Sequence, residues 1–253
     1  TRYETLFPYT TLFRSFSSWV HDPADPGSLA NDVVVSIARD AEGRLWVGTL
    51  GGLDRMDGDS FAHYTERPGT DGALASGVIR ALFRDSRGWL WVGTSGGGLY
   101  RYLPGTDSFL PVRSASSGLP SDYVFSIRED GEGRLWLALW YYGLSLYDPV
   151  AGTFENHRLE DGRAYFVNAD VPGKVYAGTW GGGLFELDQA DGAVRRFTSD
   201  GERRWLLPHD TMYSMLVDRA GDAWIGTNGG GFSMLLRDEA GVSLYEHDPS
   251  DPG

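Results

Sequence analysis

The sequence predicts an all-β fold, a β-propeller made of four-stranded antiparallel blades. Two observations lead to this prediction. The motif Asp-x-x-Gly-x-x-aromatic occurs five times at a near-constant spacing, which indicates a repeat architecture. The 253 residues also include 35 glycines and 13% aromatic residues, a composition that favours short strands joined by tight turns. The five motifs are Asp40/Gly43/Trp46, Asp85/Gly88/Trp91, Asp130/Gly133/Trp136, Asp170/Gly173/Tyr176 and Asp218/Gly221/Trp224.

The motif spacing sets the size of one blade. The aspartates at positions 40, 85, 130, 170 and 218 are 45, 45, 40 and 48 residues apart. The carboxylate of an Asp-x-x-Gly turn can accept local backbone N–H bonds, and the glycine can adopt a positive φ. Four short antiparallel strands with their turns fill such a period, and their radial repetition is a propeller.

Each repeat divides into four predicted strands. The first is an apolar run before the Asp-x-x-Gly turn, over residues 33–39, 78–84, 123–129, 164–169 and 211–217. The second carries the motif aromatic, over residues 45–49, 90–94, 135–139, 175–179 and 223–227. A glycine-rich turn follows, and the third strand begins at Leu53, Leu99, Leu144, Leu184 and Phe232. A polar turn leads to the fourth, over residues 61–65, 109–113, 154–158, 194–198 and 242–247.

The recurrent residues are interpreted as framework. The aromatic residue of each second strand is predicted to pack between neighbouring blades, where burial contributes about 2–3 kcal/mol. A residue type that recurs in every blade is explained by what every blade needs. The repeated Asp, Gly and Trp residues are therefore not taken as a functional site.

The chain is expected to contain one propeller domain, residues 16–253, after an N-terminal segment that does not belong to it. Residues 5–15 resemble a translated sequencing adapter, so residues 1–15 are interpreted as artefactual or disordered. Residues 16–27 and 244–253 match each other, and each ends a blade and links to another. We therefore expect five blades of a larger, seven-bladed ring, with a closed five-bladed ring as the alternative. The predicted blades span about residues 28–66, 76–114, 121–159, 163–199 and 210–248.

Composition excludes several classes of partner. A net charge of −13 argues against nucleic acid, which needs clustered Lys and Arg, and against an anionic membrane surface. Without cysteine the chain has neither disulfides nor a thiolate metal site. No apolar stretch is long enough to span a membrane, and no signal peptide is visible.

The sequence contains no recognisable catalytic motif. Gly-x-Ser-x-Gly, His-Glu-x-x-His and a phosphate-binding loop with Lys are all missing. The five histidines are scattered, and His63, His157 and His247 recur at blade edges, where a solvated or packing role outweighs metal binding. We therefore expect no catalytic residue, no metal and no cofactor.

A ligand site is expected where the repeats differ from one another. Fourth-to-first and second-to-third strand loops share one face of a propeller, and on that face the turn of the third blade departs from the glycine-rich pattern. Aromatic rings beside amide, guanidinium and imidazole groups suit a sugar, whose ring stacks while its hydroxyls need polar partners. The alternative is that these side chains fill the channel mouth or pack against further blades. The candidate ligand-binding residues are Trp140, Tyr141, Tyr142, Trp180, Trp205, His209 and Asn228, with Arg203 and Arg204 nearby.

Residues 40–55, 85–101 and 218–232 carry strings that resemble the two-component regulator propeller repeat. In that family, tandem seven-bladed propellers form the periplasmic sensor of hybrid histidine kinases or diguanylate cyclases, and many respond to glycan fragments. The resemblance implies a bacterial, periplasmic sensor that relays a signal to downstream domains of the same chain, meets the membrane through other segments and forms a homodimer at full length. Blade three departs at residues 138–143, and blade four has Tyr176 in place of Trp.

Three functions are compatible with the sequence. The first is a non-catalytic propeller that binds an oligosaccharide or another small ligand, or relays a signal. The second is a carbohydrate-active hydrolase or lyase, in which hydrolysis needs two carboxyl groups about 5–10 Å apart. Asp122, Asp161 and Asp210 are its candidates, and each is equally a turn residue. The third is a protein-interaction scaffold, whose mark is a broad apolar patch without a pocket.

Overall fold

A computed structural model of the chain describes residues 2–6, 15–200, 207–236 and 242–245. The chain divides into two compact units, Thr1–Val112 and Arg113–Gly253, which are described separately. The described residues form five four-stranded antiparallel sheets and one two-stranded hairpin. The predicted all-β architecture of four-stranded blades is confirmed.

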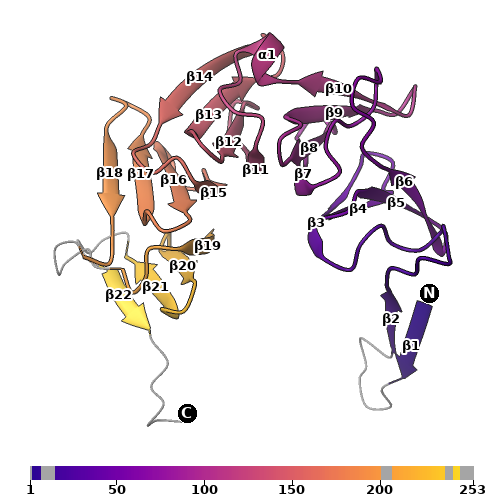
Figure 1. Ribbon diagram of the computed structural model, residues 1–253. Coiled ribbons are helices and arrows are strands. Elements are labelled where there is room, and N and C mark those ends of the chain that lie inside the picture. Colours follow the sequence, from indigo (N-terminus) through magenta and orange to yellow (C-terminus); the bar gives the residue numbers. More distant parts are fainter. Residues whose placement is uncertain (1, 7–14, 201–206, 237–241, 246–253) are drawn as a thin grey trace. The chain divides into compact units, whose positions relative to one another are not determined.

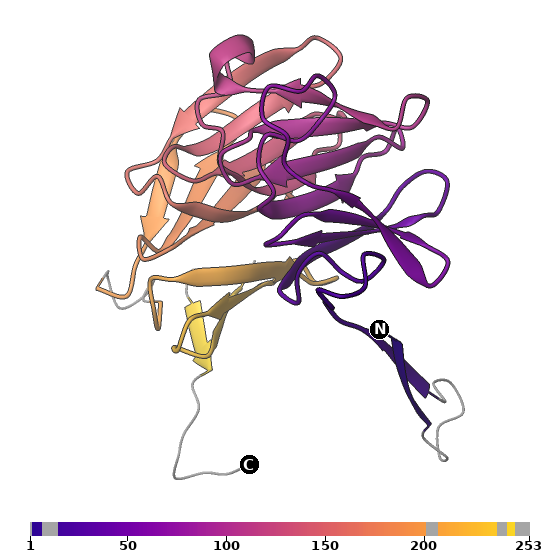
Figure 2. The same ribbon diagram turned by 45° about the vertical axis from the view of Figure 1, so that its right-hand side comes forward.

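The N-terminal unit contains the hairpin and two blades (Figure 2). The hairpin pairs β1 (Arg2–Leu6) with β2 (Ser15–Trp19). Residues 2–6, part of the segment interpreted as artefactual or disordered, thus form a strand. The pairing does not test the origin of that segment. The first blade is β3 (Val34–Arg39), β4 (Leu45–Thr49), β5 (Leu53–Asp57) and β6 (Ser60–Tyr64). The second is β7 (Ile79–Arg84), β8 (Leu90–Thr94), β9 (Leu99–Leu103) and β10 (Ser108–Val112).

The C-terminal unit contains three blades, and their sheets lie side by side (Figure 1). A helical turn that the sequence did not predict, α1 (Ser114–Ser117), precedes them. The third blade is β11 (Val124–Glu129), β12 (Leu135–Leu139), β13 (Gly143–Asp148) and β14 (Thr153–Arg158). The fourth is β15 (Ala164–Asn168), β16 (Lys174–Thr179), β17 (Leu184–Asp188) and β18 (Val194–Phe197). The fifth is β19 (Met212–Val217), β20 (Ala223–Thr227), β21 (Phe232–Leu235) and β22 (Val242–Tyr245). Every blade strand begins at the predicted residue or next to it.

The first strand of every blade carries a β-bulge at its second residue. The pairing register with the second strand shifts there, so that one residue is left without a partner in the ladder. A bulge re-aims the side chain of its extra residue and raises the local twist. The bulged residues are Val35, Arg80, Phe125, Tyr165 and Tyr213.

Two of the motif tryptophans, Trp46 and Trp136, pack between neighbouring blades, as predicted. Trp46 is fully buried and shares a cluster with Tyr102 and Phe109 of the second blade. Trp136 is equally buried and shares a cluster with Val167 and Phe185 of the fourth. Stacked sheets thus cover each other's apolar faces, and this is the core of each unit.

Three of the five motif aspartates accept a hydrogen bond from the tryptophan of their own blade. The Nε1 atom of Trp46 donates to Asp40 at 2.8 Å, and Trp91 and Trp224 each donate to the aspartate of their own motif at 2.9 Å. Burial raises the pKa of Asp40, but hydrogen bonds from Trp46 and Arg44 outweigh this and lower the pKa below its usual value. In these three blades the repeated Asp and Trp therefore form one hydrogen-bonded unit of the framework.

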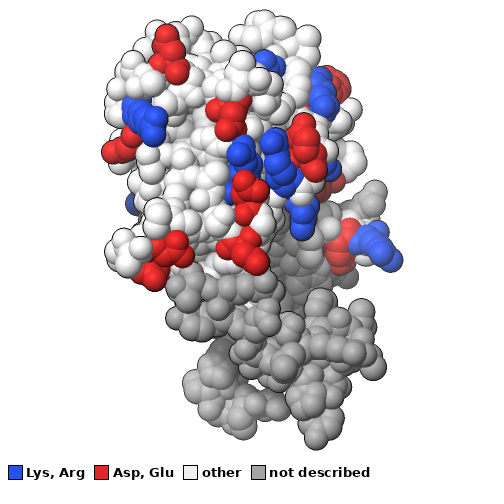
Figure 3. Space-filling view, turned by 90° about the vertical axis from the view of Figure 1, so that its right-hand side faces the viewer, with Lys and Arg blue, Asp and Glu red and all other residues white. Residues whose placement is uncertain are grey.

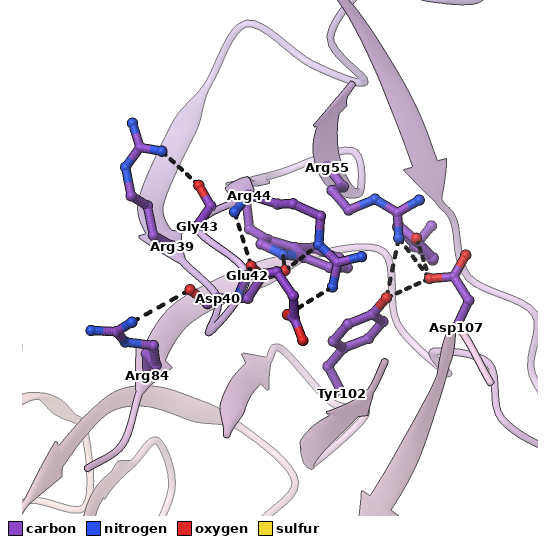
Figure 4. A network of polar contacts seen from close by, with 11 residues as sticks. Arg39, Asp40, Glu42, Gly43, Arg44, Arg55, Arg84, Tyr102 and Asp107 are labelled. Carbon is purple, nitrogen blue, oxygen red and sulfur yellow. Dashed lines mark hydrogen bonds and ion pairs between the residues drawn. The ribbon is translucent and has the colours of Figure 1, made fainter. Parts of the chain in front are cut away.

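A second polar network joins the two blades of the N-terminal unit (Figure 4). Asp107, in the turn between β9 and β10, accepts hydrogen bonds from Arg55, Tyr64 and Tyr102 at 2.7, 2.7 and 2.6 Å. Its φ of 48° is unusual for a residue other than glycine. Burial raises the pKa of Asp107, but the three hydrogen bonds outweigh this and hold the pKa below its usual value. We call these four residues the Asp107 clamp.

Acidic and basic side chains are interspersed on the face of the molecule seen in Figure 3. Ion pairs among the described residues include Arg44 with Asp40 and Arg55 with Asp107. The described part of that face therefore offers no broad basic patch of the kind that binds nucleic acid. Among the described residues, no helix is both long enough and apolar enough to cross a membrane.

Candidate functional site

The turn between β12 and β13 places an exposed tyrosine where the other long turns have glycine. Tyr141 has a φ of 75°, and Gly96, Gly181 and Gly229 at the equivalent positions have φ values of 97°, 100° and 92°. A bulky side chain in this left-handed region costs about 1–3 kcal/mol, and such strain gathers at functional sites. Tyr141 nevertheless stays 65% exposed, so its burial does not offset that cost.

Five aromatic side chains of the C-terminal unit form a continuous row, which we call the aromatic row. The row begins with Phe125 stacked on Trp140 at 4.9 Å between ring centroids. Trp140 lies 6.4 Å from Trp180, and Tyr165 lies 5.9 Å from Phe125 and 5.5 Å from Trp180. Tyr213 completes the row at 5.6 Å from Trp180. With Trp180 36% and Tyr213 41% exposed, part of the row is open to solvent.

Two repeated backbone features build this row from three blades. Phe125, Tyr165 and Tyr213 are the bulged residues of β11, β15 and β19, so each is re-aimed away from the ladder. Trp140 and Trp180 each follow the last residue of a second strand. Isolated bridges pair them with the loop into the next blade, at Arg163 and Thr211 respectively. Because the same two positions recur in each blade, neighbouring blades bring their aromatic rings together.

A pocket of about 490 Å³ opens beside Tyr141, and we call it the Tyr141 pocket. Tyr141 connects it to the aromatic row, because its ring lies 6.3 Å from that of Trp140. Gly162 lies against the backbone of Tyr141 and Tyr142, where a Cβ atom would come within 3.0 Å. The lining residues are Tyr141, Tyr142, Arg158, Leu159, Glu160, Asp161, Gly162, Arg163 and Arg196.

Charged groups in the Tyr141 pocket are mostly paired with one another. Arg163 binds Asp161 through two hydrogen bonds of 3.0 and 2.7 Å. Burial raises the pKa of Asp161, but these bonds outweigh it and lower the pKa below its usual value. Arg196 pairs with Glu160 at 3.0 Å and donates to the carbonyl of Gly182 at 2.7 Å.

Arg158 differs from the other two arginines of the pocket. Its guanidinium lies 5.9 Å from the centre of the Tyr142 ring, a cation–π distance. It forms no ion pair with any residue that the structure describes. Of the charged groups that line the Tyr141 pocket, the Arg158 guanidinium is thus the one that can form an ion pair with a ligand.

The structure brings four of the predicted ligand residues together. Trp140 and Trp180 belong to the aromatic row, and Tyr141 and Tyr142 line the adjoining pocket. Whether they bind a ligand stays a prediction.

The other three predicted ligand residues have different surroundings. His209 accepts a hydrogen bond from the backbone N–H of Thr211 at 2.9 Å, which ties it to its own loop. Asn228 is exposed, and its backbone N–H donates to the carbonyl of Thr211 at 2.9 Å. Trp205, with Arg203 and Arg204, lies outside the described residues.

Four residues of this candidate site were not among those predicted from the sequence. Phe125, Tyr165 and Tyr213 read as ordinary apolar residues of a first strand, and Arg158 as the end of a fourth strand. A comparison of the five first strands at their second residue contains a signal, because that position changes from Val35 and Arg80 to three aromatic residues. The side chain at this position is re-aimed by the β-bulge, and the bulge is visible only in the register of the backbone pairing.

The aspartates considered for hydrolysis are engaged in their own loops. Asp122 accepts hydrogen bonds from the N–H and hydroxyl of Ser114, both at 2.7 Å. Asp210 accepts the same pair from Ser199 at 2.6 and 2.9 Å, and Asp161 is held by Arg163. These contacts support the turn-residue interpretation of all three. The described residues also contain no group of three or more His, Cys, Asp or Glu residues that could hold a metal ion.

Comparison with solved structures places the chain among known propellers. It matches the extracellular domain of the hybrid two component system BT3049 from B. thetaiotaomicron with a TM-score of 0.66 and 21% identity, covering 87% of this chain and 36% of that one. The extracellular domain of the one component system BT4673 from the same organism gives a TM-score of 0.68 and 18% identity, covering 95% and 40%. Catalytically inactive virginiamycin B lyase from Staphylococcus aureus gives 0.60 and 11%, covering 85% and 70%. The chain spans less than half the length of the two extracellular domains.

Sequence comparison identifies the repeat itself. No curated protein matches the chain. The family described as two component regulator propeller matches four segments, residues 28–51, 73–96, 118–141 and 206–229. Each segment covers the link, first strand and second strand of one blade, and the fourth blade, with Tyr176 in place of Trp, is not among them. Four of the five blades described here therefore each contain a segment that matches the two component regulator propeller model.

Proposed function

We propose that this chain is a ligand-sensing propeller of a bacterial signalling receptor, and that it binds an oligosaccharide with the aromatic row and the Tyr141 pocket. The repeat family and the two extracellular domains of similar fold support a sensor outside the cytoplasm, in the periplasm or at the cell surface. Fold alone does not imply function, so the binding proposal depends on the site.

The observation that carries the proposal is Tyr141. The repeat fills this left-handed position with glycine in the second, fourth and fifth blades, and only the third blade accepts the strain of a tyrosine. That tyrosine is exposed, lies beside a pocket and adjoins a row of partly exposed rings. Aromatic faces next to polar groups suit a pyranose, which stacks with its C–H face and hydrogen-bonds through its hydroxyls.

The proposal is tested by screening the chain against an array of neutral and acidic oligosaccharides, followed by calorimetry on the members that bind. We expect binding to at least one class, and loss of that binding in Trp180→Ala. The matched control is Trp89→Ala, which removes a tryptophan of the N-terminal unit whose ring packs on Arg101 at 4.2 Å. An array without any binding, or equal losses in the two variants, would contradict the proposal.

A carbohydrate-active enzyme is the weaker candidate. It requires two carboxyl groups free to act as acid and base, and in the Tyr141 pocket Glu160 and Asp161 are both paired with arginines. The lowered pKa of Asp161 favours its ionised form, which suits a structural ion pair better than a general acid.

A further inference from the structure

We infer that the Tyr141 pocket is a subsite for the anionic group of an acidic oligosaccharide, and that Arg158 binds this group. The inference rests on the proposed function, because it assigns a chemical class to the ligand of the same site. It follows from the charges that line the pocket and from the position of Arg158 beside the Tyr142 ring.

The first step is the charge available in the pocket. Three guanidinium groups and two carboxylates line it, and the carboxylates of Asp161 and Glu160 are held by Arg163 and Arg196. Arg158 is the third guanidinium, and no described residue forms an ion pair with it. A ligand that enters this pocket therefore meets one uncompensated positive charge, although the chain as a whole carries −13.

The second step is how Arg158 is positioned. Residue 158 ends β14 and pairs in register with Gly143 of β13, directly after the turn that contains Tyr141 and Tyr142. The Tyr142 ring, 5.9 Å from the guanidinium, holds the group by a cation–π contact that leaves its N–H donors available. A planar guanidinium with free donors can bind a carboxylate or a sulfate through two parallel hydrogen bonds.

The third step is the shape of the ligand. Tyr141 offers an exposed ring in the pocket that Arg158 also lines, so an anion site and a stacking surface belong to one pocket. A sugar ring that carries its own carboxylate or sulfate fits both features, whereas a neutral sugar leaves Arg158 without an ionic partner. A uronate and a sulfated sugar present the same chemistry to Arg158, and only experiment separates them.

The test compares acidic ligands with uncharged ones, and one pair of them differs only in the esterification of its carboxyl groups. The chain is titrated with trigalacturonate, with the same trisaccharide fully methyl-esterified, with sulfated carrageenan oligosaccharides and with neutral galacto-oligosaccharides. We expect binding to one of the two acidic probes, and weaker binding as the salt concentration rises. Esterification should remove most of the affinity for the uronate. Preference for the carrageenan set over trigalacturonate would identify sulfate as the anion.

The protein variants provide the second arm. Arg158→Gln is expected to weaken binding of the acidic probe about 10- to 100-fold, the loss typical of one charge-assisted contact. Arg158→Lys keeps the charge without the planar fork and should lose less. Arg195→Gln is the matched control, an exposed arginine of β18 that does not line the pocket. Because Arg158 is exposed, the variants should unfold at the wild-type temperature.

The outcomes separate the inference from the proposed function. Tight binding of the acidic probe by Arg158→Gln, or a preference for neutral or esterified probes that Trp180→Ala abolishes, would overturn the anionic subsite and leave the oligosaccharide site standing. Absence of binding to every probe would overturn both. Loss of acidic binding in Arg158→Gln and in Trp180→Ala, but not in Arg195→Gln, would support both.

Discussion

At the scale of single residues, the informative positions are those where one blade departs from the repeat. Tyr141 occupies a position that is glycine in other blades and has a positive φ. The Nε1 atom of Trp136 lacks the hydrogen bond that motif tryptophans form in other blades. The first departure lies at the proposed site, whereas the second lies in the core. Both can be tested by substitution, because the other blades supply the matched comparison.

Replacing Tyr141 by glycine should separate stability from binding. The substitution restores the residue that the turn has in other blades and removes about 1–3 kcal/mol of left-handed strain, partly offset by the greater chain entropy of glycine in the unfolded state. We expect Tyr141→Gly to have a higher free energy of unfolding in urea, by about 1 kcal/mol, and to bind oligosaccharide more weakly. The control is Gly96→Tyr, which should destabilise the chain. A Tyr141→Gly chain that is less stable than wild type would contradict this account.

The buried tryptophans should differ in the cost of losing their indole N–H. Trp46 donates to Asp40, whereas the Nε1 atom of Trp136 is buried without a hydrogen-bond partner among the described residues. Both residues are fully buried at the same place in the repeat. Because a lost hydrogen bond adds about 1 kcal/mol to the cost, we expect Trp46→Phe to be more destabilising than Trp136→Phe by that amount. Urea unfolding of the two variants measures the difference, and equal losses would show that the Asp40 bond contributes nothing.

At the scale of elements, the turns and strand ends connect blades and build the site. The Asp107 clamp joins the turn between β9 and β10 to strands β5 and β6 of the neighbouring blade. In the C-terminal unit the bulges of β11, β15 and β19 and the residues after β12 and β16 carry the aromatic row. The aromatic row uses residues at or near the ends of strands, where the repeat allows variation.

The Asp107 clamp should make the stability of the N-terminal unit depend on acid pH. The folded state lowers the pKa of Asp107, so its contribution is present above the ordinary value of 3.8 and is lost as the pH falls through the lower folded pKa. Because the side chain is half-exposed, the effect should stay below about 1 kcal/mol. Asp107→Asn tolerates the same backbone conformation and removes the charge. It should lower the free energy of unfolding at pH 7 and lower it less near pH 2.5, as urea titrations would measure. An equal loss at both pH values would contradict the assignment.

Much of the fold could be predicted from the sequence, because it repeats. Each Asp-x-x-Gly turn fixes the position of the next strand, so every blade strand begins at or next to its predicted residue. Residues of the candidate site could be predicted only where the residue type differs from that of the other blades, at Trp140–Tyr142 and Trp180. Phe125, Tyr165 and Tyr213 escaped because apolar residues are expected in a first strand, and only the backbone register reveals their bulge. Arg158 escaped because its significance depends on which neighbouring carboxylates other arginines occupy.

At the scale of the whole molecule, the framework residues occur in both units, whereas the residues of the proposed site occur in one unit. The framework of Asp, Gly and Trp recurs along the chain and explains the four repeats that the family matches. The proposed site lies in the C-terminal unit, where the first strands carry aromatic bulges. The chain therefore combines a uniform architecture with one specialised region, and ligand binding should perturb that region selectively.

The central claim is that the aromatic row and the Tyr141 pocket bind an oligosaccharide. The most direct test is fluorine NMR of the chain labelled with 5-fluorotryptophan, with Trp140, Trp180 and Trp89 assigned by single substitutions. The labelled chain is titrated with trigalacturonate, carrageenan oligosaccharides and neutral galacto-oligosaccharides. We predict that one probe shifts the Trp140 and Trp180 resonances in a saturable manner and leaves that of Trp89 unchanged. Saturable binding that moves Trp89 while Trp140 and Trp180 stay fixed, or no shift with any probe, would contradict it.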